Sequence, residues 1–280
     1  MSMQKVWLIT GCSTGFGRSL ANEVLASGGK VAVTSRNPKD VEDIVTAYPE
    51  TAFALKLDVL NKEEIKTAVE EAVAHFGQID VLVNNAGIGY FAAVEESEEE
   101  EVRRMFDINV FGLADVTNAV LPYMRKRRAG HILNIASIGG LRSFPGVGFY
   151  NATKYAVDGL SEALSKEVAP LGIKVTIIAP SGFRTDWAGR SAKDTVVEID
   201  DYAETARKNI ESIRGVSGNQ AGDPVRAAKA MIQVTEVEHP PLRLLLGVAA
   251  LKGARMKLEE LKEDFDAWAA VSEGADFPKD

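Results

Sequence analysis

The chain has 280 residues, of which 46% are hydrophobic and 26% charged, enough to bury one α/β core without metals or disulfides. Its net charge of −8 leaves no basic excess to displace counterions from phosphates, which argues against broad nucleic-acid binding. A single cysteine excludes an internal disulfide and suits a reducing compartment. We find no basic and apolar leader and no apolar stretch of membrane-spanning length, so we expect a cytoplasmic protein without a membrane partner.

Short apolar runs alternate along the chain with segments of helical periodicity, which predicts an α/β fold with a doubly wound parallel sheet. Runs this apolar predict strands that are covered by helices on both faces of the sheet. We find no internal repeat and no low-complexity linker that would mark a second domain. The expected strands cover residues 5–10, 30–35, 52–57, 79–83, 130–136, 173–179 and 243–247.

The first expected strand leads directly into a glycine-rich turn and a helix. Thr10 to Gly17 reads Thr-Gly-Cys-Ser-Thr-Gly-Phe-Gly, and helical periodicity follows from Arg18 to Ala26. Because glycines let the backbone approach a ligand and the free N–H groups of a helix N-terminus attract anions, this order predicts a phosphate site, although an ordinary β-to-α turn can look the same. The phosphate loop of nucleoside triphosphatases is excluded, since Gly-Lys-Ser/Thr is absent at the required distance. We interpret Cys12 as a packing residue.

Two charged runs flank one predicted helix. Glu95 to Glu101 precedes an apolar helix that should begin near Val102, and Arg125 to Arg128 lies where that helix should end. An acidic start and a basic end both complement the helix dipole, so we interpret these runs as solvated helix ends and not as interaction patches. The three histidines lack ligand-like spacing and there is no Cys/His cluster, so we expect no metal site.

Tyr150 and Lys154 lie four residues apart in a predicted helix, which places a phenol and an ammonium on one face. A nearby cation favours the phenolate, so such a pair can pass a proton to an oxygen. The simpler interpretation is a half-buried ring beside a solvated lysine. Tyr155 points about 100° away from Lys154 around the helix and cannot share that face.

Five motifs in order carry a resemblance to a known family. The turn has the spacing T-G-x-x-x-G-x-G, Asn84-Asn85-Ala86-Gly87 follows a strand, Asn109 lies on a later helix, Ser137 follows a further strand, and Tyr150-x-x-x-Lys154 comes 13 residues beyond Ser137. Over about Lys5 to Leu246 this resembles the short-chain dehydrogenase/reductase family. The resemblance implies a Rossmann-like, seven-stranded sheet and an NAD(P)(H)-dependent enzyme that interconverts a ketone or aldehyde with an alcohol.

The resemblance also implies roles for four residues. Tyr150 would give a proton to the carbonyl oxygen as the hydride reaches the carbon. Lys154 would lower the pKa of Tyr150 and hold the nicotinamide ribose. Ser137 would hydrogen-bond the carbonyl oxygen, and Asn109 would anchor a water that passes protons to Lys154.

The end of the second strand favours NADP(H) over NAD(H). An acidic residue there would bind the ribose 2′-OH of NAD, whereas this chain has Ser35 followed by Arg36, and an arginine accommodates the 2′-phosphate of NADP. Arg36 could instead be a solvated loop residue. In the family pattern Ser181 stands where a glycine is usual, which leaves the backbone path there open. By resemblance, the remaining cofactor-binding residues are Gly11, Ser13, Thr14, Gly15, Phe16, Gly17, Asp58, Val59, Asn85, Ala86, Gly87, Tyr150, Lys154, Pro180, Phe183 and Thr185.

The segments expected around the reacting carbon are rich in apolar groups, which predicts an apolar substrate. Residues from about 183 to 222 are polar and weakly periodic, which fits a mobile lid or, alternatively, a plain surface excursion. Arg142 and Arg184 could each face a substrate carboxylate, but loop arginines are more often solvated. The predicted pocket residues are Tyr90, Phe91, Phe144, Phe149 and Trp187.

We expect one domain over residues 1–250, followed by an amphipathic helix from Ala254 to Ala270 and a polar tail from Ser272. Whether this helix covers its own domain or a neighbour stays open, as does assembly into a homodimer or homotetramer. Two other function classes are weighed. A nucleotide-sugar epimerase or dehydratase would show T-G-x-x-G-x-x-G and a larger C-terminal domain, and a non-catalytic NADP(H)-binding redox sensor would be expected to lack the tyrosine or the lysine.

Overall fold

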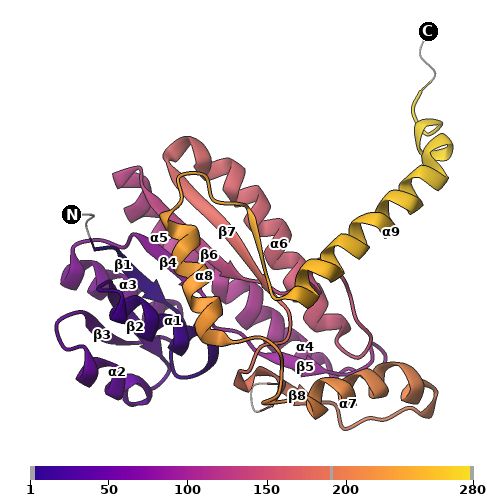
Figure 1. Cartoon of the computed structure of the whole chain (residues 1–280), viewed down its shortest axis with the longest axis horizontal. Coiled ribbons are helices and arrows are strands. Elements are labelled where there is room, and N and C mark those ends of the chain that lie inside the picture. Colours follow the sequence, from indigo (N-terminus) through magenta and orange to yellow (C-terminus); the bar gives the residue numbers. More distant parts are fainter. Residues whose placement is uncertain (1–3, 190–191, 278–280) are drawn as a thin grey trace.

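A seven-stranded parallel sheet runs through the centre of the molecule with helices on both sides (Figure 1). The computed structural model describes residues 4–189 and 192–277. The strand order is β3-β2-β1-β4-β6-β7-β9, so the winding direction reverses between β1 and β4, where ligands of such sheets bind. The strands are β1 Val6–Ile9, β2 Lys30–Ser35, β3 Ala52–Lys56, β4 Val81–Asn84, β6 Gly130–Ile135, β7 Ile173–Pro180 and β9 Arg243–Leu246.

The predicted α/β fold and all seven predicted strands are confirmed, with ends that differ by two residues at most. The strands form because their runs of Val, Ile and Leu are buried on both faces, as in β1, where all four residues are buried. Two separate apolar clusters lie on the two faces of the sheet. One joins β1 and β2 to α1 and α8, and the other joins β4 and β6 to α3 and α5.

The helices that cover the sheet have amphipathic sequences whose apolar sides face these clusters. The α-helices are α1 Gly15–Ala26, α2 Glu42–Ala47, α3 Lys62–Phe76, α4 Glu99–Phe106, α5 Leu113–Arg127, α6 Gly148–Val168, α7 Lys208–Gly215, α8 Pro224–Glu236 and α9 Val248–Glu273. Short 3-10 turns are η1 Pro38–Val41, η3 Ile138–Gly140, η4 Ala169–Leu171, η5 Asp186–Ala188 and η6 Asp200–Tyr202, and π-helical turns are η2 Asp107–Gly112 and η7 Ala203–Arg207.

The helix predicted to begin near Val102 begins at Glu99 and contains a π-helical turn. Glu99, Glu100 and Glu101 occupy its first turn, and its last turn is basic, so the expected charge pattern at both ends is present. Backbone angles stay in the right-handed helical region through η2, so α4, η2 and α5 form one continuous rod. Its C-cap residue, Arg128, adopts the left-handed conformation with φ 51°.

The predicted lid region contains regular structure that its weak periodicity did not indicate. β8 Ala192–Asp194 pairs in parallel with β5 Gly89–Phe91, forming a second sheet of two strands. The turns η5, η6 and η7 and helix α7 make up much of the remainder. Because β5 follows the turn after β4, this small sheet joins the region to the carboxyl edge of the main sheet.

The C-terminal helix α9 is longer at both ends than the predicted 254–270. Its first turns pack Ala250 and Ala254 against Ile138, in the loop that follows β6. Beyond those turns the helix extends away from the rest of the molecule (Figure 1).

Stability below neutral pH should depend on His131, at the start of β6. His131 is buried with Nε2 2.9 Å from Thr176 Oγ1, and burial, aided by the nearby Lys174 and Lys5, lowers the pKa of His131 to about 4. In the unfolded chain the pKa returns to its ordinary value near 6.5. Between these values the unfolded chain binds a proton that the native state does not, so stability falls as the pH falls through that window.

We therefore expect His131→Gln to lose less stability than the wild type on going from pH 7 to pH 5, with the difference about 2 kcal/mol in urea-unfolding free energy. The matched control is His239→Gln, because the His239 side chain is 91% exposed and should leave the pH dependence unchanged. An equal loss of stability in wild type and His131→Gln would show that His131 is not the group responsible.

Candidate active site

The four residues predicted to be catalytic come from three elements that meet beyond the carboxyl ends of β4 and β6. Ser137 follows β6, Tyr150 and Lys154 lie on α6, and Asn109 lies in η2. The Ser137 side chain lies close enough to the Tyr150 phenol for its hydrogen bonding to influence the pKa of Tyr150. Lys154 Nζ lies 5.7 Å from the centre of the Tyr150 ring, and Asn109 Nδ2 donates to Thr153 Oγ1 over 3.3 Å. The structure thus brings together residues that are up to 45 positions apart in the sequence.

Ser137 is held in place by the start of the loop that follows it. Its Oγ accepts a hydrogen bond of 3.0 Å from the backbone N–H of Gly139 and caps the 3-10 turn η3. The hydroxyl therefore faces Tyr150 from a fixed backbone position.

The Tyr150 phenol is 8% exposed, and this burial raises the pKa of Tyr150, while the hydrogen bond with Ser137 acts in the opposite direction. Burial penalises the charged phenolate, so the phenol keeps its proton at neutral pH. The sequence predicted that Lys154 would lower this pKa. In the structure burial is the largest influence on the pKa of Tyr150, and it acts in the opposite direction.

Lys154 is buried and donates from Nζ to the backbone carbonyl oxygen of Ile135 over 2.8 Å. Burial lowers the pKa of Lys154 to about 8, because removing an ammonium from water disfavours the charged form. Its charge is therefore easily lost or regained near neutral pH. By contrast, Tyr155 is 41% exposed, which agrees with its assignment to a different face of α6.

Asn109 connects three parts of the site through its side-chain amide. Its Oδ1 accepts from the N–H of Ile88 over 2.9 Å, and its Nδ2 donates to the carbonyl oxygen of Ile88 over 2.9 Å. The same Nδ2 reaches Thr153 on α6. Asn109 lies within the π turn η2, and π turns inside α-helices are frequent at functional sites.

The glycine-rich turn after β1 has the geometry of an anion cradle. Gly15 has φ 59°, a conformation that side chains other than glycine rarely adopt, and a methyl group at Gly17 would lie 2.3 Å from the carbonyl oxygen of Gly11. Thr14 is the N-cap of α1 and makes no capping hydrogen bond with its side chain. The N–H groups at the start of α1 therefore lack a side-chain partner, and this arrangement fits the phosphates of a dinucleotide.

Other predicted cofactor residues border this turn. Asn85 Nδ2 donates to the carbonyl oxygens of Thr10 and Gly11 over 2.9 and 3.0 Å, which joins the Asn-Ala-Gly segment to the glycine-rich turn. Thr185 lies on the opposite side, since a methyl group at Gly15 would be 3.5 Å from Thr185 Cβ. Asp58 Oδ1 accepts from the N–H of Leu60 over 3.0 Å, and Val59 beside it is buried.

Two arginines lie near the end of β2: Arg36, which directly follows the strand, and Arg18, which reaches this region from α1. The sequence analysis selected only Arg36. Ser35 is buried and donates to the carbonyl oxygen of Asn37 over 2.5 Å, whereas Arg36 is exposed. The sequence analysis did not select Arg18 as a candidate for binding the cofactor. Its position directly after Gly15-Phe16-Gly17, at the start of the first helix, was the signal that could have found it. It donates to the carbonyl oxygen of Ser13 over 3.4 Å and forms an ion pair with Asp43.

Aromatic side chains gather beside the Tyr150 ring. The centre of the Trp187 ring lies 4.8 Å from that of Tyr150 and 5.3 Å from that of Phe91. Tyr90 and Phe149 belong to the same apolar cluster. Phe144 does not: it is 36% exposed on the loop before α6, and the structure does not bring it into this group.

Arg214, on α7, holds the segment around Gly189 and Ala192 against this cluster. Its guanidinium donates to the carbonyl oxygens of Gly189 and Ala192 over 2.7 and 2.8 Å and lies 4.5 Å from the centre of the Phe91 ring. These contacts of Arg214 keep the neighbouring Trp187 next to Tyr150. The ring of Phe183, at the start of the lid, packs 5.1 Å from that of Phe16, and Phe183 belongs to the main core, next to Pro180 at the end of β7.

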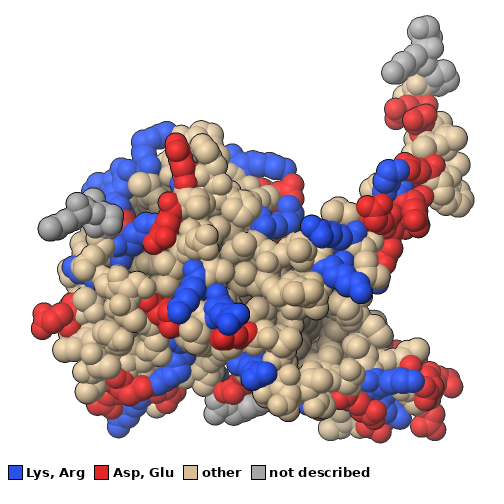
Figure 2. Space-filling model, viewed as in Figure 1, with Lys and Arg blue, Asp and Glu red and all other residues tan. Residues whose placement is uncertain are grey.

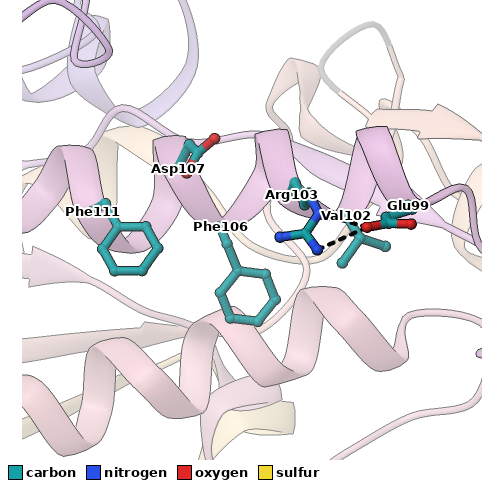
Figure 3. Close-up of a pocket in the computed structure, with 6 residues that line it drawn as sticks. All are labelled: Glu99, Val102, Arg103, Phe106, Asp107 and Phe111. Carbon is teal, nitrogen blue, oxygen red and sulfur yellow. Dashed lines mark hydrogen bonds and ion pairs between the residues drawn. The ribbon is translucent and has the colours of Figure 1, made fainter.

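A separate open hollow of about 420 Å³ lies on the surface of the α4–η2–α5 rod (Figure 3). Arg103 crosses it to form an ion pair with Glu99, with 2.7 Å between Nη2 and Oε1. None of its lining residues belongs to the predicted active site, so we do not assign the chemistry to it. They are Glu99, Val102, Arg103, Phe106, Asp107 and Phe111.

Among residues 4–189 and 192–277, no cluster of His, Cys, Asp or Glu is arranged to hold a metal ion. Cys12 is buried in the glycine-rich turn with Sγ 3.2 Å from the carbonyl oxygen of Ile9, and burial raises the pKa of the Cys12 thiol to about 12. That thiol is therefore not a nucleophile at neutral pH.

In the described part of the chain, no helix has both the length and the apolar character needed to span a membrane.

A doubly wound parallel sheet with an anion cradle and a Ser-Tyr-Lys group at its carboxyl edge defines an oxidoreductase of the nicotinamide-nucleotide type. Residues 5–196 match the family model described as short chain dehydrogenase. The chain is 37% identical to the oxidoreductase BOA17 of Botryotinia fuckeliana over 96% of this chain and 98% of that protein. It is 38% identical to a 3-ketodihydrosphingosine reductase of Bacteroides thetaiotaomicron over 87% and 88%.

Among solved structures, a short-chain dehydrogenase from Streptomyces avermitilis matches with a TM-score of 0.92 and 42% identity, covering 99% of this chain and 100% of that one. ElxO with NADP bound matches with a TM-score of 0.75 and 30% identity over 89% and 100%. A 3-ketoacyl-(acyl-carrier-protein) reductase from Brucella melitensis, complexed with NADH, matches with 0.71 and 29% over 86% and 96%. The chain therefore belongs to the short-chain dehydrogenase family, as the motifs predicted, and is an oxidoreductase acting on CH–OH and C=O groups.

Proposed function

We propose that this protein is an NADP(H)-dependent oxidoreductase that interconverts an apolar ketone or aldehyde with its alcohol. The observation that carries the proposal is the grouping of Ser137, the buried Tyr150 and Lys154 at the sheet edge that also holds the anion cradle. Family membership supports the reaction class. The residue roles, the choice of cofactor and the nature of the substrate are the proposed parts.

In this proposal Tyr150 is the proton donor to the carbonyl oxygen. When bound, the nicotinamide supplies or accepts the hydride. Ser137 orients the substrate oxygen by hydrogen bonding, and because Ser137 is capped into η3 it does so from a fixed position. Lys154, whose pKa burial lowers to about 8, returns a proton to Tyr150 after each turnover. Asn109 holds the segment around Ile88 against α6 and, as the motif implies, anchors a water beside Lys154.

The preference for NADP(H) rests on charge at the end of β2. Ser35 leaves this position without a carboxylate, and the exposed Arg36 beside it supplies a positive charge. Arg18 adds a second cation in the same region, where it is already ion-paired with Asp43. A 2′-phosphate gains from such charges, whereas a free ribose 2′-OH gains from an acid that is absent here. Related structures hold NADP in one case and NADH in another, so the arginines are the argument for this chain.

The apolar nature of the substrate is supported by what surrounds Tyr150. Phe91, Phe149 and Trp187 belong to the cluster next to its ring. Both arginines that could have bound an anion have protein partners: Arg142 is ion-paired with Glu260 at 3.1 Å, and Arg184 Nε donates to the carbonyl oxygen of Gln220 over 2.7 Å. A relative named for reducing 3-ketodihydrosphingosine, a long-chain ketone, is in keeping with this environment.

The test of the proton donor is Tyr150→Phe. It removes one hydroxyl from the proton path and nothing from the phosphate cradle, so we expect kcat to fall on the order of 10²–10⁴-fold while NADPH binding stays nearly intact. Tyr155→Phe is the matched control, because it also removes a phenol oxygen from α6, but on an exposed face of the helix. We expect this variant to retain full activity. If Tyr150→Phe keeps more than about a tenth of wild-type kcat, the proton-donor assignment is wrong.

The test of cofactor choice is the double variant Ser35→Asp/Arg36→Ala. A carboxylate repels a 2′-phosphate and accepts a hydrogen bond from a 2′-OH, so we expect the ratio of kcat/KM with NADPH to that with NADH to fall roughly tenfold or more. Arg226→Ala, which removes an exposed arginine from the start of α8, serves as the control. Equal efficiency of the wild type with both cofactors would remove the basis of the proposal.

The test of substrate class compares matched ketones that differ only by an added carboxylate or phosphate. We expect higher kcat/KM for the uncharged member of each pair, because the cluster around Tyr150 offers an anion no compensation for lost hydration. A clear preference for the anionic members would instead assign Arg142 or Arg184 to substrate binding.

A further inference from the structure

The outer part of helix α9 makes no contact that buries it in its own chain. Ala250 and Ala254 are buried at its base, whereas every described residue beyond Leu261 is exposed. The space-filling view shows the outer part of the helix standing clear of the body (Figure 2). We call residues 255–273 the arm; only near its base does it contact the body, where Glu260 forms an ion pair with Arg142 over 3.1 Å. Isolated helices of this length are marginal in water, so burial elsewhere would stabilise it.

One side of α9 carries an apolar stripe with coiled-coil spacing. Leu251, Ala254, Leu258, Leu261, Phe265 and Trp268 follow one another at intervals of three, four, three, four and three residues. This spacing keeps apolar side chains on one seam of a helix that packs along another helix. Within the stripe Leu258, Phe265 and Trp268 are 66%, 67% and 65% exposed, which is unusual for side chains of this size.

We propose that two copies of this chain associate through their arms, paired antiparallel about a twofold axis near Leu258 and Leu261. The exposed residues of the stripe would then meet the same residues of the second copy, as a twofold interface requires, while Ala254 stays buried against Ile138 of its own chain. Trp268 at the tip of each arm would pack near Leu251 at the base of the other. Leu251 is itself 42% exposed, so base and tip each offer an unburied apolar surface to the other.

The charges on the arm favour a protein partner over a lipid surface. Helices that lie on membranes carry lysine and arginine on their polar face. The arm instead has an excess of acid, visible in Figure 2 as red along much of its length. Its acidic residues are Glu259, Glu260, Glu263, Asp264, Asp266 and Glu273, and its basic residues are Arg255, Lys257 and Lys262.

The charges flanking the stripe also favour the antiparallel orientation. In a parallel pair Lys257 would face Lys262 of the partner subunit on both sides, with no attractive pair to offset the repulsion. In an antiparallel pair Lys257 would face Asp264 of the partner subunit, and this attraction offsets the repulsion between Arg255 and the partner's Lys262. The antiparallel arrangement is therefore the one with balanced charges.

The surface area of the stripe is sufficient for a dimer of modest affinity. Aromatic side chains bury about 150–250 Å² each when fully covered, so two aromatic and three leucine side chains per copy, partly exposed at the start, would bury on the order of 1,000 Å² in total. This lies below the range of standard stable interfaces, about 1,200–2,000 Å², and corresponds to a weak dimer. The expected dimer therefore dissociates on dilution.

The first test of the arm pairing is Phe265→Glu/Trp268→Glu, measured by sedimentation velocity over a dilution series. Both side chains are exposed in one chain, so the body of the protein should stay folded, and only the unpaired arm should lose helicity. We expect the mass of the assembly to halve and the dissociation constant of the pair to rise at least about a hundredfold. The matched control, Glu259→Lys/Asp266→Lys, changes charge on the outer face of the same helix and should keep the wild-type mass. A Phe265→Glu/Trp268→Glu variant with the wild-type mass would refute the proposal.

The second test fixes the orientation by disulfide cross-linking. In an antiparallel pair Leu251→Cys/Trp268→Cys brings each new thiol next to the other type in the second copy, and a covalent dimer is expected on mild oxidation. Trp268→Cys alone should give none, because its two copies would lie at opposite ends of the pair. The native Cys12 is buried and does not interfere. Cross-linking of Trp268→Cys alone would mean parallel arms and would overturn the proposed arrangement.

Discussion

The hydrogen bond from the Lys154 ammonium to the carbonyl oxygen of Ile135 is the interaction on which the active site depends. It joins α6 to the last residue of β6, two positions before Ser137, so the helix that carries Tyr150 and the strand that leads to Ser137 are fixed to each other. The loop between them packs against α6 without a side chain at Gly140, where a methyl group would lie 2.6 Å from the carbonyl oxygen of Lys154. The distance between the serine and the tyrosine is therefore set by backbone packing.

The same burial that orders these side chains determines their protonation. It raises the pKa of Tyr150 and lowers the pKa of Lys154, so both neutral forms are favoured over a phenolate–ammonium pair. The protein thus holds a protonated phenol beside a lysine whose charge is readily exchanged near neutral pH. Trp187 and Phe91 maintain this dry environment, and Arg214 keeps the lid that carries Trp187 in place.

Much of this arrangement could be predicted from the sequence because it depends on local patterns. Apolar runs located every strand of the main sheet, since both faces of a parallel sheet are covered. The motif spacing located Ser137, Tyr150, Lys154 and Asn109, which the structure brings together. Their catalytic roles, and the individual cofactor contacts, remain predictions.

The features that were missed depend on contacts between distant segments. The strands β5 and β8 have three residues each, too few for a period to be read, and they exist because they pair with each other. Arg18 reaches the region of η1 only because α1 folds back over β2. Phe144 lies on the loop before α6, 36% exposed and outside the apolar cluster around Tyr150, and its place in the substrate pocket remains a prediction.

The π turn η2 imposes a length constraint on the rod that contains it. Each residue advances an α-helix by about 100°, so the extra residue in a π turn sets the rotation of α5 relative to α4. Met105 on α4 packs in the cluster around Tyr150, while Val116 and Val120 on α5 pack under the main sheet. A regular α-helix over the same residues would turn one of these faces into solvent. The position of Asn109 in this turn and the packing of the core therefore depend on the same helical register. A chain one residue shorter in this turn could satisfy only one of them.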